Sequence, residues 1–280
     1  RALAARAQLQ IGLLHERLGK KAEAQRAFQA VLSEFADQID VVRQAQARIS
    51  TSLPNGKRDG VSTRRIWAGA DVDLLGAPSP DGRFLTYVHW ETGDLGVHDF
   101  TTGKVRRLTN KGKESLDFAQ GSRVSPDGKH AAYAWVEDRH DGKVYSLRLI
   151  GMDGANPRIL YRDPREMDYL APQGWSPDGR QILAIFRKAD QTKQIVLLSV
   201  SDGAVRVLQS LGRRSLSKAC FSPDGRYVVY DAPPRVDAEQ NDLFVLSVES
   251  GLETPLVQHP ANDKLLGWAP DGKRILFLSD

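Results

Sequence analysis

The sequence is poor in cysteine and contains no long hydrophobic run. A single cysteine, Cys220, excludes a disulfide within the chain. No stretch of 18 apolar residues occurs, so no transmembrane helix is predicted. The Gly-x-Ser-x-Gly elbow, glycine-rich phosphate loops and paired zinc-binding histidines are also missing. The sequence therefore predicts no catalytic residue, no metal site and no cofactor.

The charge is small and unevenly placed. The formal net charge is +4, and the first 60 residues account for it with 10 Lys or Arg against 6 Asp or Glu. The remaining 220 residues are balanced, which gives no electrostatic footprint for nucleic acid. The hydrophobic content of 41% is ordinary for a globular protein, and 280 residues are enough to form a sizeable core.

A Pro-Asp-Gly motif recurs and organises most of the chain. Its five glycines follow one another at intervals of 46 to 51 residues, and a short apolar run comes after each. A period of this size, built from short strands, is typical of propeller blades. The five copies are Ser79–Arg83, Ser125–Lys129, Ser176–Arg180, Ser222–Arg226 and Ala269–Lys273.

The residues of the motif suit a tight turn. Proline pre-sets φ at the first corner, aspartate tolerates the second, and glycine takes the position with positive φ. The aspartates are therefore interpreted as turn residues and not as catalytic carboxylates. We expect Gly179 and Gly225 at positive φ, Trp175 and Trp268 buried between blades, and Cys220 as an inert buried thiol.

Each repeat can be divided into four strands. One strand leads into the Pro-Asp-Gly turn, a second leaves it, and a third and a fourth are joined by another turn with glycine. Four meandering strands make one blade of a β-propeller. The predicted third strands are Leu95–Phe100, Val144–Ile150, Ile195–Val200 and Leu243–Val248, and the fourth strands begin near Val105, Arg158, Val205 and Thr254.

The first 50 residues have a different pattern. Residues 3–18 and 21–35 are predicted helices, and a third helical stretch covers about 37–49. The first two resemble a tetratricopeptide repeat at Ile11-Gly12, Gly19, Ala24, Phe28 and Leu32, and depart from it at Gln8, His15 and Ala36. A plain helical hairpin is the alternative. Residues 51–63 are rich in turn formers and are the predicted linker.

Residues 64–280 resemble the TolB-like, WD-type propeller repeat. The resemblance rests on the aromatic residue before Ser-Pro-Asp-Gly-Arg, the apolar run, the second glycine turn and the Arg-x-Leu closing strand. The expected fold is mainly β: an incomplete, six-bladed β-propeller of four-stranded blades, preceded by a small TPR-like α-helical hairpin. Arg64–Ala70 would supply the outer strand of the last blade, and the chain would carry four blades and half of a fifth.

The candidate binding residues lie in the connections between the second and third strands and between blades, because binding residues concentrate on such loops. The alternative is a solvated charged rim. The candidates are Trp90, Arg139, His140, Arg213 and Arg214.

Three functions are compatible with the sequence. The resemblances imply a non-catalytic scaffold that binds protein partners. One alternative is the accessory propeller of a bacterial enzyme or regulator, either a prolyl-oligopeptidase-type peptidase or a Ser/Thr kinase, whose catalytic domain lies outside this piece of a longer protein. The other is a propeller that binds a small ligand or glycan. The resemblance favours a periplasmic or extracytoplasmic location, with the cytoplasm as the alternative, and the oligomeric state is left open.

Overall fold

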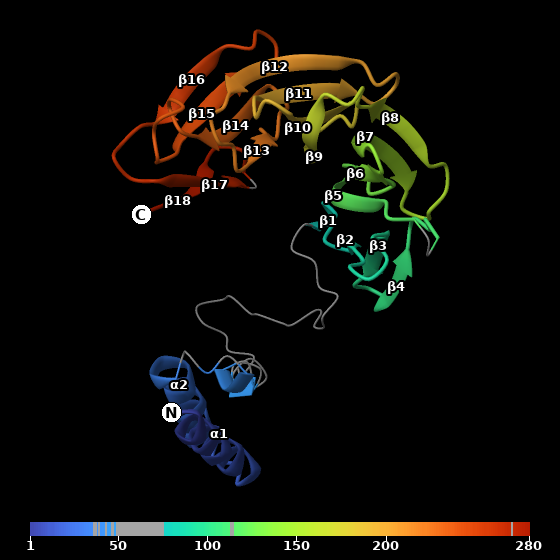
Figure 1. Ribbon diagram of the computed structural model, residues 1–280. Coiled ribbons are helices and arrows are strands. Elements are labelled where there is room, and N and C mark those ends of the chain that lie inside the picture. Colours follow the sequence, from blue (N-terminus) through green and yellow to red (C-terminus); the bar gives the residue numbers. More distant parts are fainter. Residues whose placement is uncertain are drawn as a thin grey trace. The chain divides into compact units, whose positions relative to one another are not determined.

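The chain divides into two compact units, Arg1–Ile66 and Trp67–Asp280, and each is described by itself. The structure is a computed structural model, and it describes residues 1–35, 38, 40–42, 44, 45, 48, 76–112, 115–269 and 271–280 (Figure 1). The predicted linker 51–63 and the predicted outer strand Arg64–Ala70 lie outside the described residues. The domain boundaries and the six-blade count therefore stay predictions.

The first unit contains two helices, α1 (Ala2–Arg17) and α2 (Lys21–Glu34). Their core is built around Phe28, which is fully buried, and Gly12 lies so close that a Cβ there would overlap the Phe28 ring. Gly12 and Phe28 are two of the residues on which the resemblance to a tetratricopeptide repeat rests. Leu9 packs in this core with Phe28, whereas Leu14 on the same helix is exposed. Residues 40–42, 44, 45 and 48 are helical, as predicted for part of the third stretch.

The second unit is an incomplete propeller of four-stranded antiparallel blades (Figure 1). Within each blade the strands are hydrogen-bonded in chain order, so each blade is a simple meander. Blade one contains β1 (Ala77–Pro78), β2 (Phe84–Val88), β3 (Leu95–Asp99) and β4 (Lys104–Arg107), and blade two contains β5 (Phe118–Val124), β6 (His130–Arg139), β7 (Gly142–Gly151) and β8 (Arg158–Arg162).

The remaining blades continue the same order. Blade three contains β9 (Met167–Trp175), β10 (Gln181–Lys188), β11 (Lys193–Ser199) and β12 (Val205–Gly212), and blade four contains β13 (Ala219–Phe221), β14 (Tyr227–Ala232), β15 (Asp242–Ser247) and β16 (Glu253–Val257). In the described residues the fifth sheet has two strands, β17 (Asp263–Trp268) and β18 (Ile275–Ser279). The mainly-β fold class predicted from the repeat is confirmed.

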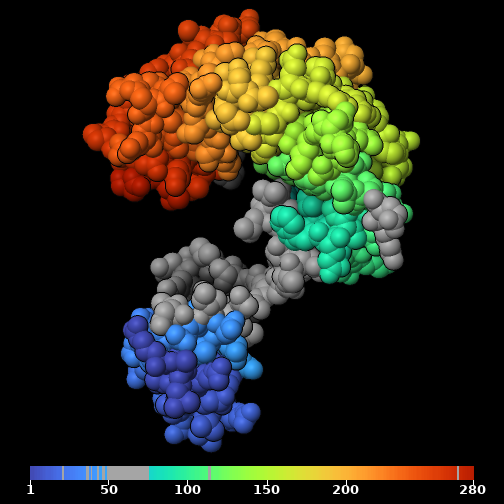
Figure 2. All heavy atoms as spheres, in the orientation of Figure 1, coloured from blue at the N-terminus to red at the C-terminus, as the bar shows by residue number. Residues whose placement is uncertain are grey.

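The blades pack face to face, and each hydrophobic core lies between two of them. One cluster joins Tyr133 and Trp135 of blade two to Leu95 and Val97 of blade one. The inner strands also follow one another, since β1 contacts β5, β5 contacts β9, β9 contacts β13, and β13 contacts β17. In the space-filling view these blades form one continuous packed run from teal to red (Figure 2). The burial of apolar faces between neighbouring blades is what stabilises this unit.

The Pro-Asp-Gly turns are closed by a serine as well as by the aspartate. In blade four the Ser222 hydroxyl donates to Oδ1 of Asp224 (2.6 Å) and accepts the backbone N–H of Tyr227 (3.0 Å). Asp224 Oδ1 also accepts the N–H of Arg226 (3.1 Å), and Gly225 has a φ of 73°. Gly179 has a φ of 72°, so both predicted left-handed glycines are confirmed.

The aspartate is held as an anion in this turn. The hydrogen bond from Ser222, followed by that from the Arg226 side chain, lowers the pKa of Asp224 to about 2. The turns of blades one to three repeat the serine–aspartate contact, at 2.5, 2.6 and 2.5 Å. The interpretation of these carboxylates as turn residues agrees with the contacts that they make.

The tryptophans of the inner strands lie between blades but are less buried than predicted. The Trp175 ring packs against the core shared by blades two and three, and its Nε1–H donates to the carbonyl of Arg123 in blade two (2.9 Å). Trp268 packs against the junction of blades four and five. Both side chains are half-buried because the inner strand lies at the edge of its blade. Cys220 is half-buried as well, and burial raises its pKa to about 11, which agrees with an inert thiol.

Candidate functional site

The propeller has two faces of different character. The Pro-Asp-Gly turns and the turns between the third and fourth strands lie at one edge of every blade, and this edge is called the turn face. The connections between the second and third strands and between blades lie at the opposite edge, which is called the loop face. An antiparallel meander requires this separation, because alternate connections come at opposite ends of the strands. All five predicted site residues belong to the loop face or to the strand ends beside it.

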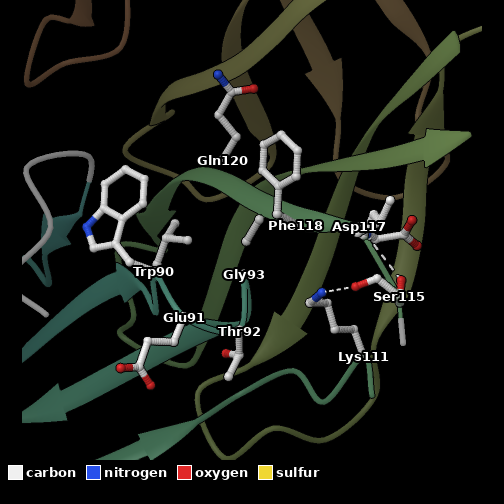
Figure 3. Close-up of a pocket in the computed structure, with 12 residues that line it drawn as sticks. Trp90, Glu91, Thr92, Gly93, Lys111, Ser115, Asp117, Phe118 and Gln120 are labelled. Carbon is white, nitrogen blue, oxygen red and sulfur yellow. Dashed lines mark hydrogen bonds between the residues drawn. The ribbon is translucent and has the colours of Figure 1, made fainter. Parts of the chain in front are cut away.

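A pocket of about 500 Å³ opens on the loop face between blades one and two. One wall is the β2–β3 connection with Trp90 to Gly93, and the other is the segment that leads into β5 with Ser115 to Gln120 (Figure 3). Trp90 is 60% exposed and Leu116 is 74% exposed, so both present large apolar surfaces to solvent. The pocket therefore combines a loop that carries a predicted site residue with an inter-blade segment that was also expected to bind.

A buried carboxylate next to the pocket helps to fix its walls. Asp94 is almost fully buried, and its Oδ1 accepts the hydroxyl of Thr109 (2.9 Å) and the backbone N–H of Lys111 (3.0 Å). The backbone N–H of Ala119 donates to the carbonyl of Gly93 (2.8 Å), which ties blade two to the β2–β3 connection. These bonds hold the two walls at a fixed separation, so the pocket is formed before any ligand binds.

Polar groups line one end of this apolar pocket. Figure 3 shows Lys111, Ser115 and Asp117 together at the end of the pocket away from Trp90, and the ammonium group of Lys111 donates to the carbonyl of Ser115. Phe118 lies between the two ends, and the ammonium group of Lys143 lies 5.5 Å from the centre of its ring. A few polar groups at the end of an apolar pocket are typical of binding sites.

A group of four charged side chains lies in blade two. Glu137 on β6 is almost fully buried and binds three guanidinium groups: those of Arg139 (2.8 Å), Arg148 (2.8 Å) and Arg162 (2.6 Å). Burial acts to raise the pKa of Glu137, but the hydrogen bond from Arg139 and the charges of the three arginines outweigh it and hold the pKa below its usual range. Glu137 is therefore ionised at neutral pH.

Arg139 and His140 lie at the tip of the β6–β7 hairpin. The connection between the second and third strands of blade two is shorter than its polar sequence suggests, because β6 pairs with β7 as far as Arg139 opposite Gly142. Glu137, Asp138 and Arg139 are consecutive polar residues of a paired strand. His140 is exposed in the short connection that remains.

The predicted sites Arg213 and Arg214 have different environments. Arg213 is exposed, and its Nε–H donates to the carbonyl of Asp190 (3.2 Å). The side chain of Arg214 is only 12% exposed; it pairs with Glu253 of blade four (3.3 Å) and lies over the ring of Phe244 (5.6 Å). Arg214 thus joins blades three and four and presents little surface to a partner.

Trp90 lies at the junction of blades one and two, Arg139 and His140 lie at the β6–β7 hairpin of blade two, and Arg213 and Arg214 lie between blades three and four. The structure adds Phe118, Glu137 and Arg162, which the sequence did not single out. The contacts of Glu137 join residues 2, 11 and 25 positions away, so no local motif indicates them. Strand register alone puts these side chains on one face of the blade.

Two features are missing from the described part of the chain. No three His, Cys, Asp or Glu side chains in the described part of the chain are grouped so that they could hold a metal ion. None of the described helices is both long enough and apolar enough to cross a membrane.

Comparison with known proteins identifies the repeat. A family model described as the TolB beta propeller domain matches residues 130–280. The chain is 25% identical over 207 residues to the uncharacterized peptidase YuxL of Bacillus subtilis, a match over 71% of this chain and 28% of that protein. It is 26% identical over 166 residues to the Tol-Pal system protein TolB of Escherichia fergusonii, over 53% of this chain and 36% of that protein.

The fold is also found among solved structures. The structure of putative TolB from Agrobacterium tumefaciens superposes with a TM-score of 0.61 at 20% identity, over 78% of this chain and 73% of that chain. Likeness at this identity shows the propeller fold alone. The chain spans about a third of the length of the two curated relatives. The helical residues before the match are outside the family model, so the TPR-like repeat stays a prediction.

Proposed function

Because the chain belongs to the TolB β-propeller family, we propose that it is a non-catalytic interaction module that holds a protein partner on its loop face. The pocket between blades one and two carries this proposal. It is preformed, mostly apolar, and open to solvent beside an exposed tryptophan. Exposed aromatic residues over a pocket are the usual anchors of protein–protein contacts.

The pocket suits one large side chain of a partner segment. Its walls are Trp90 and Phe118, with Leu116 at the rim. Burying an aromatic or branched aliphatic side chain there would remove apolar surface of both partners from water, at roughly 25 cal/mol per Å². The surrounding polar loops would then form the rim that excludes water from the contact.

The test is a titration of the isotopically labelled 280-residue chain with blocked peptides that carry Phe, Leu or Trp. Backbone amide signals of residues 89–93 and 115–120 should shift, and Trp90→Ala should remove the shifts while the chain stays folded. Val236→Ala is a matched control, because Val236 is an exposed apolar residue of the loop face at another blade. Shifts that are confined to the turn face would contradict the proposal.

The similarity to the peptidase YuxL supports a second candidate: the accessory propeller of a larger hydrolase. Since this chain matches 28% of that protein, the remainder of the relative lies outside the comparison. Sequencing the complete reading frame distinguishes the two functions. A Gly-x-Ser-x-Gly elbow in a following domain would favour the accessory propeller, and turnover of chromogenic peptide substrates by the full protein would establish it.

A further inference from the structure

The charged group around Glu137 has more positive charge than the buried carboxylate needs. Arg148 alone neutralises it: its side chain is 20% exposed, it donates to Oε1 of Glu137, and its guanidinium lies 5.0 Å from the centre of the Trp135 ring. One buried carboxylate with one buried guanidinium is already a compensated pair. The other two arginines are therefore an excess of two positive charges in this group.

The two excess arginines are held side by side. Arg139 and Arg162 both donate to the same atom, Oε2 of Glu137, at 2.8 and 2.6 Å. Their side chains are 53% and 49% exposed. A guanidinium has five N–H donors, and in the contacts with the described residues each of these two uses one. Glu137 thus orients two forks whose remaining donors face solvent.

The carboxylates nearby are engaged elsewhere. Asp141 pairs with Arg165 (2.5 Å), and Asp138 lies 4.0 Å from the ammonium group of Lys143. Oδ1 of Asp117 accepts the backbone N–H of Asp138 (3.2 Å). Asp117 and Asp141 do act on Arg139, since both contribute to raising its pKa, but less than Glu137 does. None of these acids is hydrogen-bonded to Arg139 or Arg162 among the contacts of the described residues.

The Trp90 pocket is connected to the hairpin that carries Arg139 through Asp117 and Phe118. Asp117 and Phe118 line the pocket, and they contact Asp138 and Lys143, which lie on either side of the β6–β7 hairpin tip beside Arg139. A partner segment that fills the pocket and extends toward the β6–β7 hairpin would reach Arg139, and Arg162 lies beside Arg139 because both bind Glu137.

We propose that Arg139 and Arg162 form a clamp for the carboxylate of an Asp or Glu in the protein partner, next to the apolar residue that fills the Trp90 pocket. The inference rests on the proposed function. Two guanidinium forks match a planar carboxylate in bidentate fashion, and such charge-assisted bonds are about twice as strong as neutral ones. An acidic side chain of a protein fits better than free phosphate, because a free ion would leave the adjoining pocket empty.

The experiment uses an array of blocked octapeptides with one Phe, Leu or Trp and one Glu at every spacing, each beside its Gln counterpart. The wild-type chain should bind the best Glu peptides about 10-fold more tightly than their Gln counterparts. The double variant Arg139→Gln/Arg162→Gln should lose this preference and keep the affinity for the Gln peptides. Trp90→Ala should weaken binding to both sets.

Arg165→Gln is the matched control, because Arg165 is an exposed arginine of the same loop face that has its own carboxylate. It should keep the preference for Glu. Should the double glutamine variant fail to fold, Arg139→Lys/Arg162→Lys preserves the charge without the fork and should retain only part of the preference. Thermal melting of each variant shows that the fold is intact.

The outcomes separate the clamp from the proposed function. Equal, Trp90-dependent binding of Glu and Gln peptides would overturn the clamp and leave the proposed function standing. Binding of no peptide at all would overturn both. Stronger binding of phosphoserine peptides than of Glu peptides, or displacement by inorganic phosphate at equal concentration, would overturn the assignment to a protein carboxylate.

Discussion

The turn face and the loop face are built from alternate connections of the same strands but follow opposite rules. On the turn face, serine, aspartate and glycine make the same hydrogen bonds in four successive blades. On the loop face each blade differs: blade one has an exposed tryptophan, blade two has an arginine group, and blade three contributes an inter-blade ion pair. Repetition of contacts marks the face that supports the fold, and variation is what we expect of the face that is proposed to bind a partner.

The largest loss of stability should come from adding a side-chain atom to a turn glycine that lies against the preceding blade. Gly203 has a φ of 75°, and a Cβ there would overlap the carbonyl of Leu160 in the preceding blade. Gly203→Ala should therefore destabilise the propeller by about 3 kcal/mol or more, from left-handed strain plus the clash.

Gly103 is the matched control for this change. It occupies the equivalent turn of blade one with a φ of 69°, and no atom lies near a Cβ placed there. Gly103→Ala should cost only about 1 kcal/mol. Urea unfolding measures the free energy of unfolding of both variants. Equal losses of free energy would show that the blade junction does not constrain the turn.

Ser222→Ala tests whether the buried serine supports the repeat. The substitution removes a hydroxyl that bonds both Asp224 and the N–H of Tyr227, and should cost about 1–3 kcal/mol. Blade five has Ala269 in this place. Ala269→Ser should stabilise the chain by about 1 kcal/mol in the same unfolding assay. If neither change alters the free energy of unfolding, the serine hydroxyl does not stabilise the turn.

The turn aspartates should make stability depend on acid pH. The pKa of Asp224 is about 2 in the folded chain and about 3.9 in an unfolded one. The contribution of Asp224 to the free energy of unfolding is complete above about pH 4. It is lost as the pH falls through 2, because the unfolded state binds more protons than the folded state in this range. Asp224→Asn should therefore narrow the difference in melting temperature between pH 5 and pH 2. If Asp224→Asn leaves the difference in melting temperature unchanged, the lowered pKa of Asp224 is contradicted.

The smallest stability effect should come from the loop face. Trp90→Ala removes an exposed side chain, and we expect the free energy of unfolding to change by no more than about 0.5 kcal/mol. The same variant should lose peptide binding. A loss of stability comparable to that of Ser222→Ala would mean that Trp90 supports the fold and would weaken its assignment to binding.

The sequence predicted the turn face far better than the loop face. Proline, aspartate and glycine act within a few residues of one another, so their pattern indicates the turn directly. The role of Ser222 was missed because its acceptor contact is with the N–H of Tyr227, and only the folded turn shows that the hydroxyl is buried.

On the loop face the sequence indicated the exposed Trp90 but not its environment. The pocket depends on two loops that belong to different blades, and the ion pairs of Glu137 depend on the register of β6, β7 and β8. A bulge between β7 and β8 at Leu147 and Arg148 shifts that register by one residue, which no composition pattern reports. Arg214 looked like a surface cation because its partner Glu253 lies 39 residues away.

The stacking of successive Pro-Asp-Gly turns has a consequence for how the propeller is made. A Cβ on Gly225 would lie 3.1 Å from Cδ of Pro177, and one on Gly272 would lie 3.4 Å from Cγ of Pro223. The turns of blades four and five are therefore packed on the turn of the blade synthesised just before each of them. A newly translated blade can therefore pack on the blade before it, which is already folded. This packing does not depend on residues that are translated later. Assembly can then keep pace with translation, one blade at a time, and the unpaired strands at the growing end are exposed only until the next blade arrives.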